Sequence, residues 1–275
     1  MKEVRNKDGL TEEEFLKAYN PGDYKRPSVT TDILILGMNE DYSGLKILLI
    51  KRADHPYLGS WALPGGFIEE DETAHQAANR ELKEETGLED IYLDQVYTFT
   101  KPGRDPRTWV ISIAYLALIP ELKKVEGLDD AADAAWFDLK FTDDTIELLN
   151  EEKDVQIIYE LKKETFYNGV IKYENYIPDK VSEDSLAFDH VEILIEAMKK
   201  LREQIRYSNQ AFCLVEDKFT LPELQAVYEA VLARPLYKKS FRDMISNLVE
   251  ETGSEKTSRT KSGRKCKEYR FKMEG

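Results

Sequence analysis

The 275-residue sequence has few of the residues that build disulfide frameworks, zinc sites or membrane spans. Its two cysteines, Cys213 and Cys266, are far apart and fit neither a disulfide framework nor the close ligand spacing of a zinc site. No apolar run approaches the ~18 residues that a membrane span needs, and the first residues lack the apolar segment of a secretory signal. We therefore expect a protein of a reducing compartment, the cytoplasm, with no membrane partner.

Several signatures of common enzyme classes are also missing. The sequence contains no G-x-S-x-G nucleophile elbow, no Walker A loop and no H-E-x-x-H zinc motif. The three histidines, His55, His75 and His190, are scattered along the chain, and we expect them to be structural rather than metal ligands. These absences argue against serine hydrolases, P-loop nucleotidases and zinc peptidases.

Acidic residues are in excess, and the excess is uneven along the chain. The formal net charge is -14, yet residues 207–275 contain 13 Lys and Arg against 10 Asp and Glu, so this segment is +3 and residues 1–206 are -17. Such asymmetry indicates two domains with different partners. We predict a boundary at the polar step that begins at Tyr207, which gives domains of residues 1–206 and 207–275.

The pattern of apolar residues predicts a mixed α/β first domain. Apolar and β-branched runs predict strands at residues 29–36, 45–51, 91–100, 109–119 and 134–139. Capping signals and helical spacing predict helices at residues 11–19, from residue 73 onward, and at 189–206. Because the strands come in pairs rather than alternating with helices, we expect a largely antiparallel or mixed sheet.

The helix expected from Thr73 carries three carboxylates on its inward side. At about 100° per residue, Glu81, Glu84 and Glu85 share an arc with the alanines of the first turns, where an ordinary amphipathic helix would continue into Leu or Ile. Buried carboxylates must be neutralised, paired or bound to a metal ion. Oxygen ligands alone favour Mg²⁺ or Mn²⁺, which typically also bind substrate phosphates. The alternative is a solvated, charged helix.

This stretch resembles the Nudix box, G-x5-E-x7-R-E-U-x-E-E-x-G-U, in which U is an aliphatic residue. The matching residues are Gly66, Glu72, Arg80, Glu81, Leu82, Glu84, Glu85, Gly87 and Leu88. The resemblance implies a Nudix α/β/α sandwich with a mixed sheet, whose box holds Mg²⁺ or Mn²⁺ against a nucleoside diphosphate derivative. It further implies that Glu81, Glu84, Glu85 and the Gly65 carbonyl are metal ligands. Arg80 would orient the glutamates, and Glu72 would pair within the motif.

Hydrolysis in such a site needs a general base and groups that bind the phosphates. The base is left open between Glu85 and an acid of residues 127–130. Residues 103–107 resemble ADP-ribose-handling members of the superfamily, and arginine recognises phosphate bidentately. Arg52, Arg104 and Arg107 are therefore candidates for binding the diphosphate or the terminal ribose phosphate, although a hairpin turn with surface arginines is the alternative. The same resemblance implies a homodimer.

The basic C-terminal segment has the layout of a winged helix-turn-helix domain. A capping box at Thr220 opens one helix, residues 237–249 predict a second, and a basic hairpin follows with eight cations against one acid over residues 256–272. A solvated loop or a dimerisation module is the alternative. Candidate contacts to double-stranded DNA are Lys238, Lys239, Arg242, Arg264, Lys265 and Lys267.

Residues 219–232 and 262–271 are also similar to Nudix-related transcriptional regulators of NAD metabolism. In that family the Nudix domain senses ADP-ribose or a related nucleotide, and many members have a degraded box. Here every position of the box is present. Two hypotheses follow: a metal-dependent pyrophosphatase that acts on ADP-ribose or a related nucleotide and is coupled to DNA binding, or an ADP-ribose-responsive repressor with little or no hydrolysis.

Overall fold

The computed structural model describes residues 4–89, 91–123, 131–260 and 263–273, and it contains two sheets. The larger sheet has the strand order β4-β5-β1-β2-β6-β7-β8-β9, with β3 paired to β2. Its strands are β1 (Ser28–Met38), β2 (Leu45–Arg52), β3 (Trp61–Ala62), β4 (Tyr92–Phe99), β5 (Val110–Leu118), β6 (Ala131–Phe141), β7 (Thr145–Asn150), β8 (Val155–Asn168) and β9 (Ile171–Lys180). Pairing is antiparallel except between β1 and β5, so the sheet is mixed.

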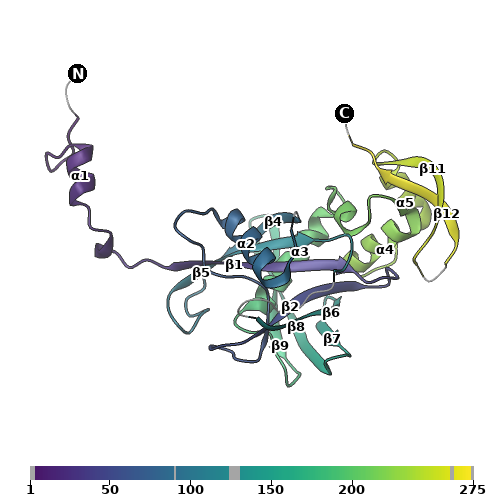
Figure 1. Ribbon diagram of the computed structural model, residues 1–275, viewed down its shortest axis with the longest axis horizontal. Coiled ribbons are helices and arrows are strands. Elements are labelled where there is room, and N and C mark those ends of the chain that lie inside the picture. Colours follow the sequence, from purple (N-terminus) through teal and green to yellow (C-terminus); the bar gives the residue numbers. More distant parts are fainter. Residues whose placement is uncertain (1–3, 90, 124–130, 261–262, 274–275) are drawn as a thin grey trace.

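Helices cover the two faces of this sheet, as expected for an α/β/α sandwich (Figure 1). Successive side chains of a strand point to opposite faces. On β1, Ile33 and Ile35 therefore pack in a core cluster with α2 (Ala74–Thr86), whereas Leu34 and Leu36 pack in a second cluster with α3 (His190–Gln204). The predicted Nudix sandwich is confirmed, and the predicted strand pairs and helices are present.

Residues 145–180 form three strands that were not expected from the sequence. They make consecutive antiparallel pairs, β7 with β8 and β8 with β9. Beyond Leu161 both faces of β8 are exposed and carry charges such as Lys162, Lys163 and Glu164. This outer part of β8 therefore lacks the alternation of apolar and polar residues that marks a strand in sequence, whereas β7 and the first half of β8 do alternate.

The C-terminal residues form the predicted winged helix layout. It comprises β10 (Phe219–Thr220), α4 (Leu221–Leu232), α5 (Lys238–Ile245), β11 (Val249–Thr257) and β12 (Lys265–Phe271). The predicted end of the second helix is wrong: α5 ends at Ile245, and Val249 already pairs with Phe271 as the first residue of β11. Pairing with a distant strand overrides the local helical spacing here.

One apolar core joins the large sheet to the winged helix. The cluster that contains Leu34 of β1 also contains Val227 of α4 and Phe241 of α5. At the end of α3, the half-buried Arg202 donates a 2.8 Å hydrogen bond to the carbonyl of Val231 on α4 and also donates to the carbonyl of Phe141 on β6. A boundary after residue 206 stays a prediction.

The N-terminal segment projects from the opposite end of the molecule (Figure 1). It contains α1 (Glu12–Ala18), which begins with a capping box between Thr11 and Glu14 and buries none of its residues, and the short 3-10 helix η1 (Pro21–Asp23). Phe15 and Leu16 are among its exposed apolar side chains. Among the described residues, no helix is long and apolar enough to cross a membrane.

Candidate functional site

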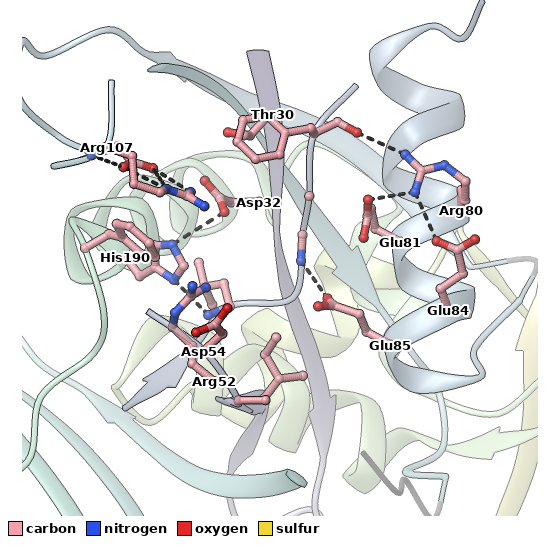
Figure 2. A pocket seen from close by; sticks show the side chains of 18 of the residues that line it. Thr30, Asp32, Arg52, Asp54, Arg80, Glu81, Glu84, Glu85, Arg107 and His190 are labelled. Carbon is pink, nitrogen blue, oxygen red and sulfur yellow. Dashed lines mark hydrogen bonds and ion pairs between the residues drawn. The ribbon is translucent and has the colours of Figure 1, made fainter. Parts of the chain in front are cut away.

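A cavity of about 540 Å³ opens between the start of α3, the inward side of α2 and the loops beside β1 and β2. Figure 2 shows α2 with Glu81, Glu84 and Glu85 on one side, and Arg52, Arg107 and His190 on the other. The three arginines predicted to bind phosphate and four of the five predicted catalytic residues line this one cavity. The fifth, Glu72, contacts Arg80 behind it. The cavity therefore has an acidic wall and a basic wall.

The loop that enters the box is fixed against β1 by main-chain hydrogen bonds. Ile33 and Thr31 donate to the carbonyls of Pro64 and Gly66, each at 2.8 Å. Gly65 lies between them with φ of 153°, and a Cβ there would be 2.0 Å from the Thr31 carbonyl oxygen. Only glycine fits this position, because both the backbone conformation and the close approach exclude a side chain. The loop thus presents the Gly65 main chain to α2.

Glu85 is the most buried carboxylate of the acidic wall, with 8% of the residue exposed. Its Oε2 accepts a 2.7 Å hydrogen bond from the Gly65 amide. Burial raises the pKa of Glu85 to about 8, and the nearby charges of Glu81 and Asp32 act in the same direction against the Gly65 hydrogen bond. The charge of Arg52 lowers the pKa of Glu85, but it does not compensate for burial, so the ionised carboxylate remains costly.

Arg80 holds the remaining box carboxylates together. It donates to Glu72 at 2.6 and 3.1 Å, to Glu81 at 2.7 Å, to Glu84 at 3.0 Å and to the Phe67 carbonyl at 3.0 Å. Burial raises the pKa of Glu81 even though its contact with Arg80 lowers it. The geometry suits the predicted roles of Arg80 in orienting Glu81 and of Glu72 in pairing with Arg80.

The donor set of the acidic wall suits a hard divalent cation. It offers carboxylate oxygens from Glu81, Glu84 and Glu85, and such ligands favour Mg²⁺ or Mn²⁺. Among the described residues, no three His, Cys, Asp or Glu side chains lie close enough together to hold a metal ion. Glu81 and Glu84 lie on Arg80, and Glu85 lies on the Gly65 amide. Glu84 is the most exposed of the three, with 45% of its side chain accessible.

Gly66 leaves space for one of these carboxylates. A Cβ at Gly66 would be 2.1 Å from Oε1 of Glu81. We expect Gly66→Ala to displace the flexible end of Glu81 and to lower turnover of a pyrophosphate substrate about a hundredfold, because misplacement of about 1 Å has that effect on a catalytic group. Kinetics on the folded variant measure this. An unchanged kcat/KM would contradict the placement of Glu81.

The basic wall is formed by Arg52 and Arg107. Arg52 donates from Nε to the Pro56 carbonyl at 2.7 Å, and no carboxylate of the described residues lies within ion-pair distance of it. Burial, and then the charge of Arg107, lowers the pKa of Arg52. Arg107 forms a paired contact with Asp105, at 2.7 to 3.2 Å. Two cations with one carboxylate partner leave a positive charge that an anion can neutralise.

Arg104 also lines the cavity, but it has a different environment, because an ion-pair network holds its side chain. Only 4% of its side chain is exposed. It donates to Asp189 at 2.9 and 2.7 Å and to Asp32 at 3.3 Å. Burial alone would lower the pKa of Arg104, but these carboxylates raise it. The structure thus gives Arg104 internal partners that the sequence did not indicate, and its predicted contact with substrate stays a prediction.

We expect Asp189→Ala to destabilise the protein by about 3 kcal/mol, because it leaves part of the charge of Arg104 buried without its partner. Chemical denaturation measures the change. Glu192→Ala is the matched control. Glu192 lies three residues after Asp189, and its carboxylate makes an exposed ion pair with Lys101. That contact should contribute less than about 1 kcal/mol. Equal effects of the two substitutions would contradict the prediction.

His190, expected from sequence to be structural rather than a metal ligand, lines the cavity. Its Nδ1 accepts a 2.8 Å hydrogen bond from the Leu63 amide, so the proton of the neutral ring is on Nε2, which lies 3.4 Å from Oδ1 of Asp32. Burial lowers the pKa of His190. Asp32 and Phe188 also line this cavity, and Asp189 holds Arg104 beside it; none of the three was expected from sequence to belong to the site. They come from distant segments, so no local motif could reveal them.

The predicted DNA contacts divide into two groups. Lys238, Lys239 and Arg242 are exposed on α5, and Arg264 and Lys265 are exposed at the end of the hairpin turn. No ion pair involves these five among the described residues. Lys267 instead contacts Glu251 at 2.9 and 3.0 Å. The basic segment of residues 256–272 is therefore less cationic in the fold than in the sequence, because acidic residues at the start of β11 pair with it.

Comparisons with known proteins match both parts of the chain. Residues 27–157 match the NUDIX domain family, and residues 211–271 match the NrtR DNA-binding winged helix domain. The "ADPR responsive transcriptional repressor NtrR" of Acinetobacter baylyi is 31% identical over 96% of this chain and 90% of its own length.

Two further relatives match one or both parts. The "ADP-ribose pyrophosphatase" of Methanocaldococcus jannaschii is 43% identical over 42% of this chain and 64% of its own length. The crystal structure of Shewanella oneidensis NrtR complexed with a 27mer DNA is 28% identical, covers 89% of this chain and 93% of its own, and has a TM-score of 0.63. The chain therefore belongs to the Nudix superfamily, in the NrtR-type group that joins a Nudix domain to a winged helix domain.

Proposed function

We propose that the protein is a metal-dependent Nudix hydrolase that cleaves the pyrophosphate of ADP-ribose or a related nucleoside diphosphate derivative and also binds DNA. The observation that carries this proposal is the complete box folded against a cavity: Glu81 and Glu85 are turned inward, opposite Arg52 and Arg107. The similarity to an ADP-ribose pyrophosphatase supports the choice of substrate.

Glu81, Glu84, Glu85 and the Gly65 carbonyl would hold Mg²⁺ or Mn²⁺. When bound, such a cation supplies charge neutralisation at the pyrophosphate and makes a water molecule more acidic. Main-chain hydrogen bonds of the same loop support the metal-binding role of the Gly65 carbonyl. The carbonyls on either side of it, those of Pro64 and Gly66, accept hydrogen bonds from β1, which fixes the position of the loop.

The residues of this chain then have separate tasks. Arg52 and Arg107 would bind the phosphate oxygens and orient the pyrophosphate, because both line the cavity on its basic wall. Arg80 holds Glu81 in place. Glu85 accepts the proton of the attacking water in this proposal. The alternative base among residues 127–130 lies outside the described residues.

The test is direct measurement of product. Purified protein incubated with ADP-ribose and Mg²⁺ or Mn²⁺ should release AMP, and a panel of nucleoside diphosphate derivatives should rank the substrates. Chelation of the metal should stop the reaction. If no compound of the panel is cleaved with either ion, hydrolysis is not the function of the cavity.

A second function, ADP-ribose-responsive repression, is favoured by the C-terminal domain. The relative from Acinetobacter baylyi carries that description and matches nearly the whole chain. The unpaired cations of α5 support binding to double-stranded DNA. We propose that the cavity also controls this binding, with hydrolysis removing the effector. DNA mobility shifts with and without ADP-ribose test the control, using the Glu85→Gln variant to keep the ligand intact.

We also propose a homodimer. The N-terminal arm supports it, because α1 presents Phe15, Leu16 and Tyr19 to solvent and buries none of its residues. An isolated helix of this length is not stable in water without a surface to pack on. Light scattering of the full chain, compared with a chain that begins at residue 25, tests whether the arm contributes to association.

A further inference from the structure

Phe188 occupies the point where the basic wall meets the start of α3. It directly precedes Asp189, the N-cap residue of α3, and its φ of 50° lies in the left-handed region. Residues other than glycine rarely adopt this conformation, and those that do cluster at binding sites. The ring is half-buried and lines the cavity. The unusual backbone of Phe188 therefore places an aromatic side chain beside the arginines that are predicted to bind phosphate.

The ring of Phe188 contacts both arginines of the basic wall. The guanidinium carbon of Arg52 lies 4.9 Å from the ring centroid, and that of Arg107 lies 5.8 Å from it. Both distances are within the ~6 Å range of cation–π attraction. His190 stacks on the same ring at 5.3 Å, and Tyr57 contacts it at 4.7 Å. These neighbours restrict the orientation of the ring.

Two cations on one ring repel each other unless anions compensate. Asp105 compensates Arg107, whereas Arg52 has no carboxylate within ion-pair distance among the described residues. The quadrupole of the ring offsets part of this repulsion in the absence of ligand. A ligand with two adjacent negative groups, such as a diphosphate, completes the charge balance, because it can accept hydrogen bonds from both guanidinium groups.

We propose that Phe188 is a positioning residue, which holds Arg52 and Arg107 at the spacing that binds the two phosphates of a diphosphate. The inference rests on the proposed function of the cavity and adds a residue that acts through the two arginines. It does not require contact between Phe188 and the substrate. The inference predicts that tight binding of a diphosphate needs an aromatic ring at position 188, and not merely an apolar side chain of similar volume.

The test compares Phe188→Leu with Phe188→Tyr. Both replacements meet the same backbone conformation, so the comparison isolates the ring. With ADP-ribose we expect Phe188→Leu to raise KM about tenfold, from the loss of two cation–π contacts, and to change kcat less than twofold. Phe188→Tyr should keep KM near the wild-type value. The thermal shift produced by Mn²⁺ should be the same in all three proteins, because the acidic wall is unchanged.

Calorimetry with inorganic diphosphate as the probe separates this inference from the choice of substrate. If the wild type binds diphosphate but does not cleave ADP-ribose, the substrate proposal fails, and tenfold weaker diphosphate binding by Phe188→Leu still supports Phe188. An unchanged affinity in Phe188→Leu would overturn the inference. So would equal weakening by Phe188→Tyr, or a parallel loss of kcat and of the Mn²⁺ shift, which would indicate a role in folding alone.

Discussion

Replacement of Glu85 by Gln should lower the hydrolysis of ADP-ribose by about three orders of magnitude. A bound cation stabilises the charge of the transition state by several kcal/mol, and each ~1.4 kcal/mol is a factor of ten in rate. Glu85 is the most buried carboxylate of the acidic wall, so the loss of its charge would remove a proposed metal ligand that water replaces poorly. Steady-state kinetics at saturating Mg²⁺ measure the loss.

The same variant should separate metal binding from folding. Mn²⁺ should raise the melting temperature of the wild type, because a ligand of the native state stabilises it, and this rise should be lost in Glu85→Gln. With a chelator present, the variant should melt no lower than the wild type. Its side-chain amide oxygen can still accept from the Gly65 amide, and no charge has to be buried.

Glu89→Gln is the matched control for this prediction. Glu89 follows α2 and pairs with Lys83 on the exposed side, with 56% of its side chain accessible. The Glu89→Gln variant should keep both the wild-type rate and the rise in melting temperature that Mn²⁺ produces. If Glu85→Gln retained more than a tenth of the wild-type rate, Glu85 would be neither an essential ligand nor the base.

Removal of three cations from α5 should weaken DNA binding about a hundredfold at moderate salt. Each cation that contacts a phosphate contributes about 0.9 to the slope of log affinity against log salt concentration. The triple replacement of Lys238, Lys239 and Arg242 by Ala should therefore flatten the slope by about 2.7. Fluorescence anisotropy with a random-sequence duplex and with a selected binding sequence measures both quantities.

The control removes three cations elsewhere. Lys162, Lys163 and Lys172 lie on the β8–β9 hairpin, so their replacement by Ala changes the net charge equally without touching the winged helix. Equal weakening by the two triple variants would show that net charge, and not the α5 surface, governs binding. Lys267→Ala should have a smaller effect than single replacements on α5, because Glu251 already pairs with Lys267.

Features set by neighbouring residues were predictable from sequence. The box helix begins at the Thr73 cap and ends at Gly87, whose φ of 69° is left-handed, and both signals are local. The shared arc of Glu81 and Glu85 follows from helical geometry. By contrast, the contact of Arg104 with Asp189 spans 85 residues, and that of Leu63 with His190 spans 127. Only the folded sheet brings these pairs together.

The wing shows why charge counts in sequence can mislead. Within residues 256–272 the cations stand almost alone, but antiparallel pairing places Glu250 opposite Arg270 and Glu251 opposite Tyr269. Glu216, outside the hairpin, pairs with Lys256 and also contacts Arg259. Registers between strands are set by long-range packing, so the neutralising partners could not be read from the basic segment itself.

The apolar core that runs from the sheet into α4 and α5 limits how the two ends of the molecule can communicate. A freely swivelling linker would have to expose that surface to water, at about 25 cal/mol for each square ångström. If an effector in the cavity controls DNA binding as proposed, small sliding of packed helices is the motion that keeps this core buried, and α3 spans the distance from His190 to Arg202. Binding in the cavity would then reach the winged helix domain through a displacement of α3 as a rigid helix.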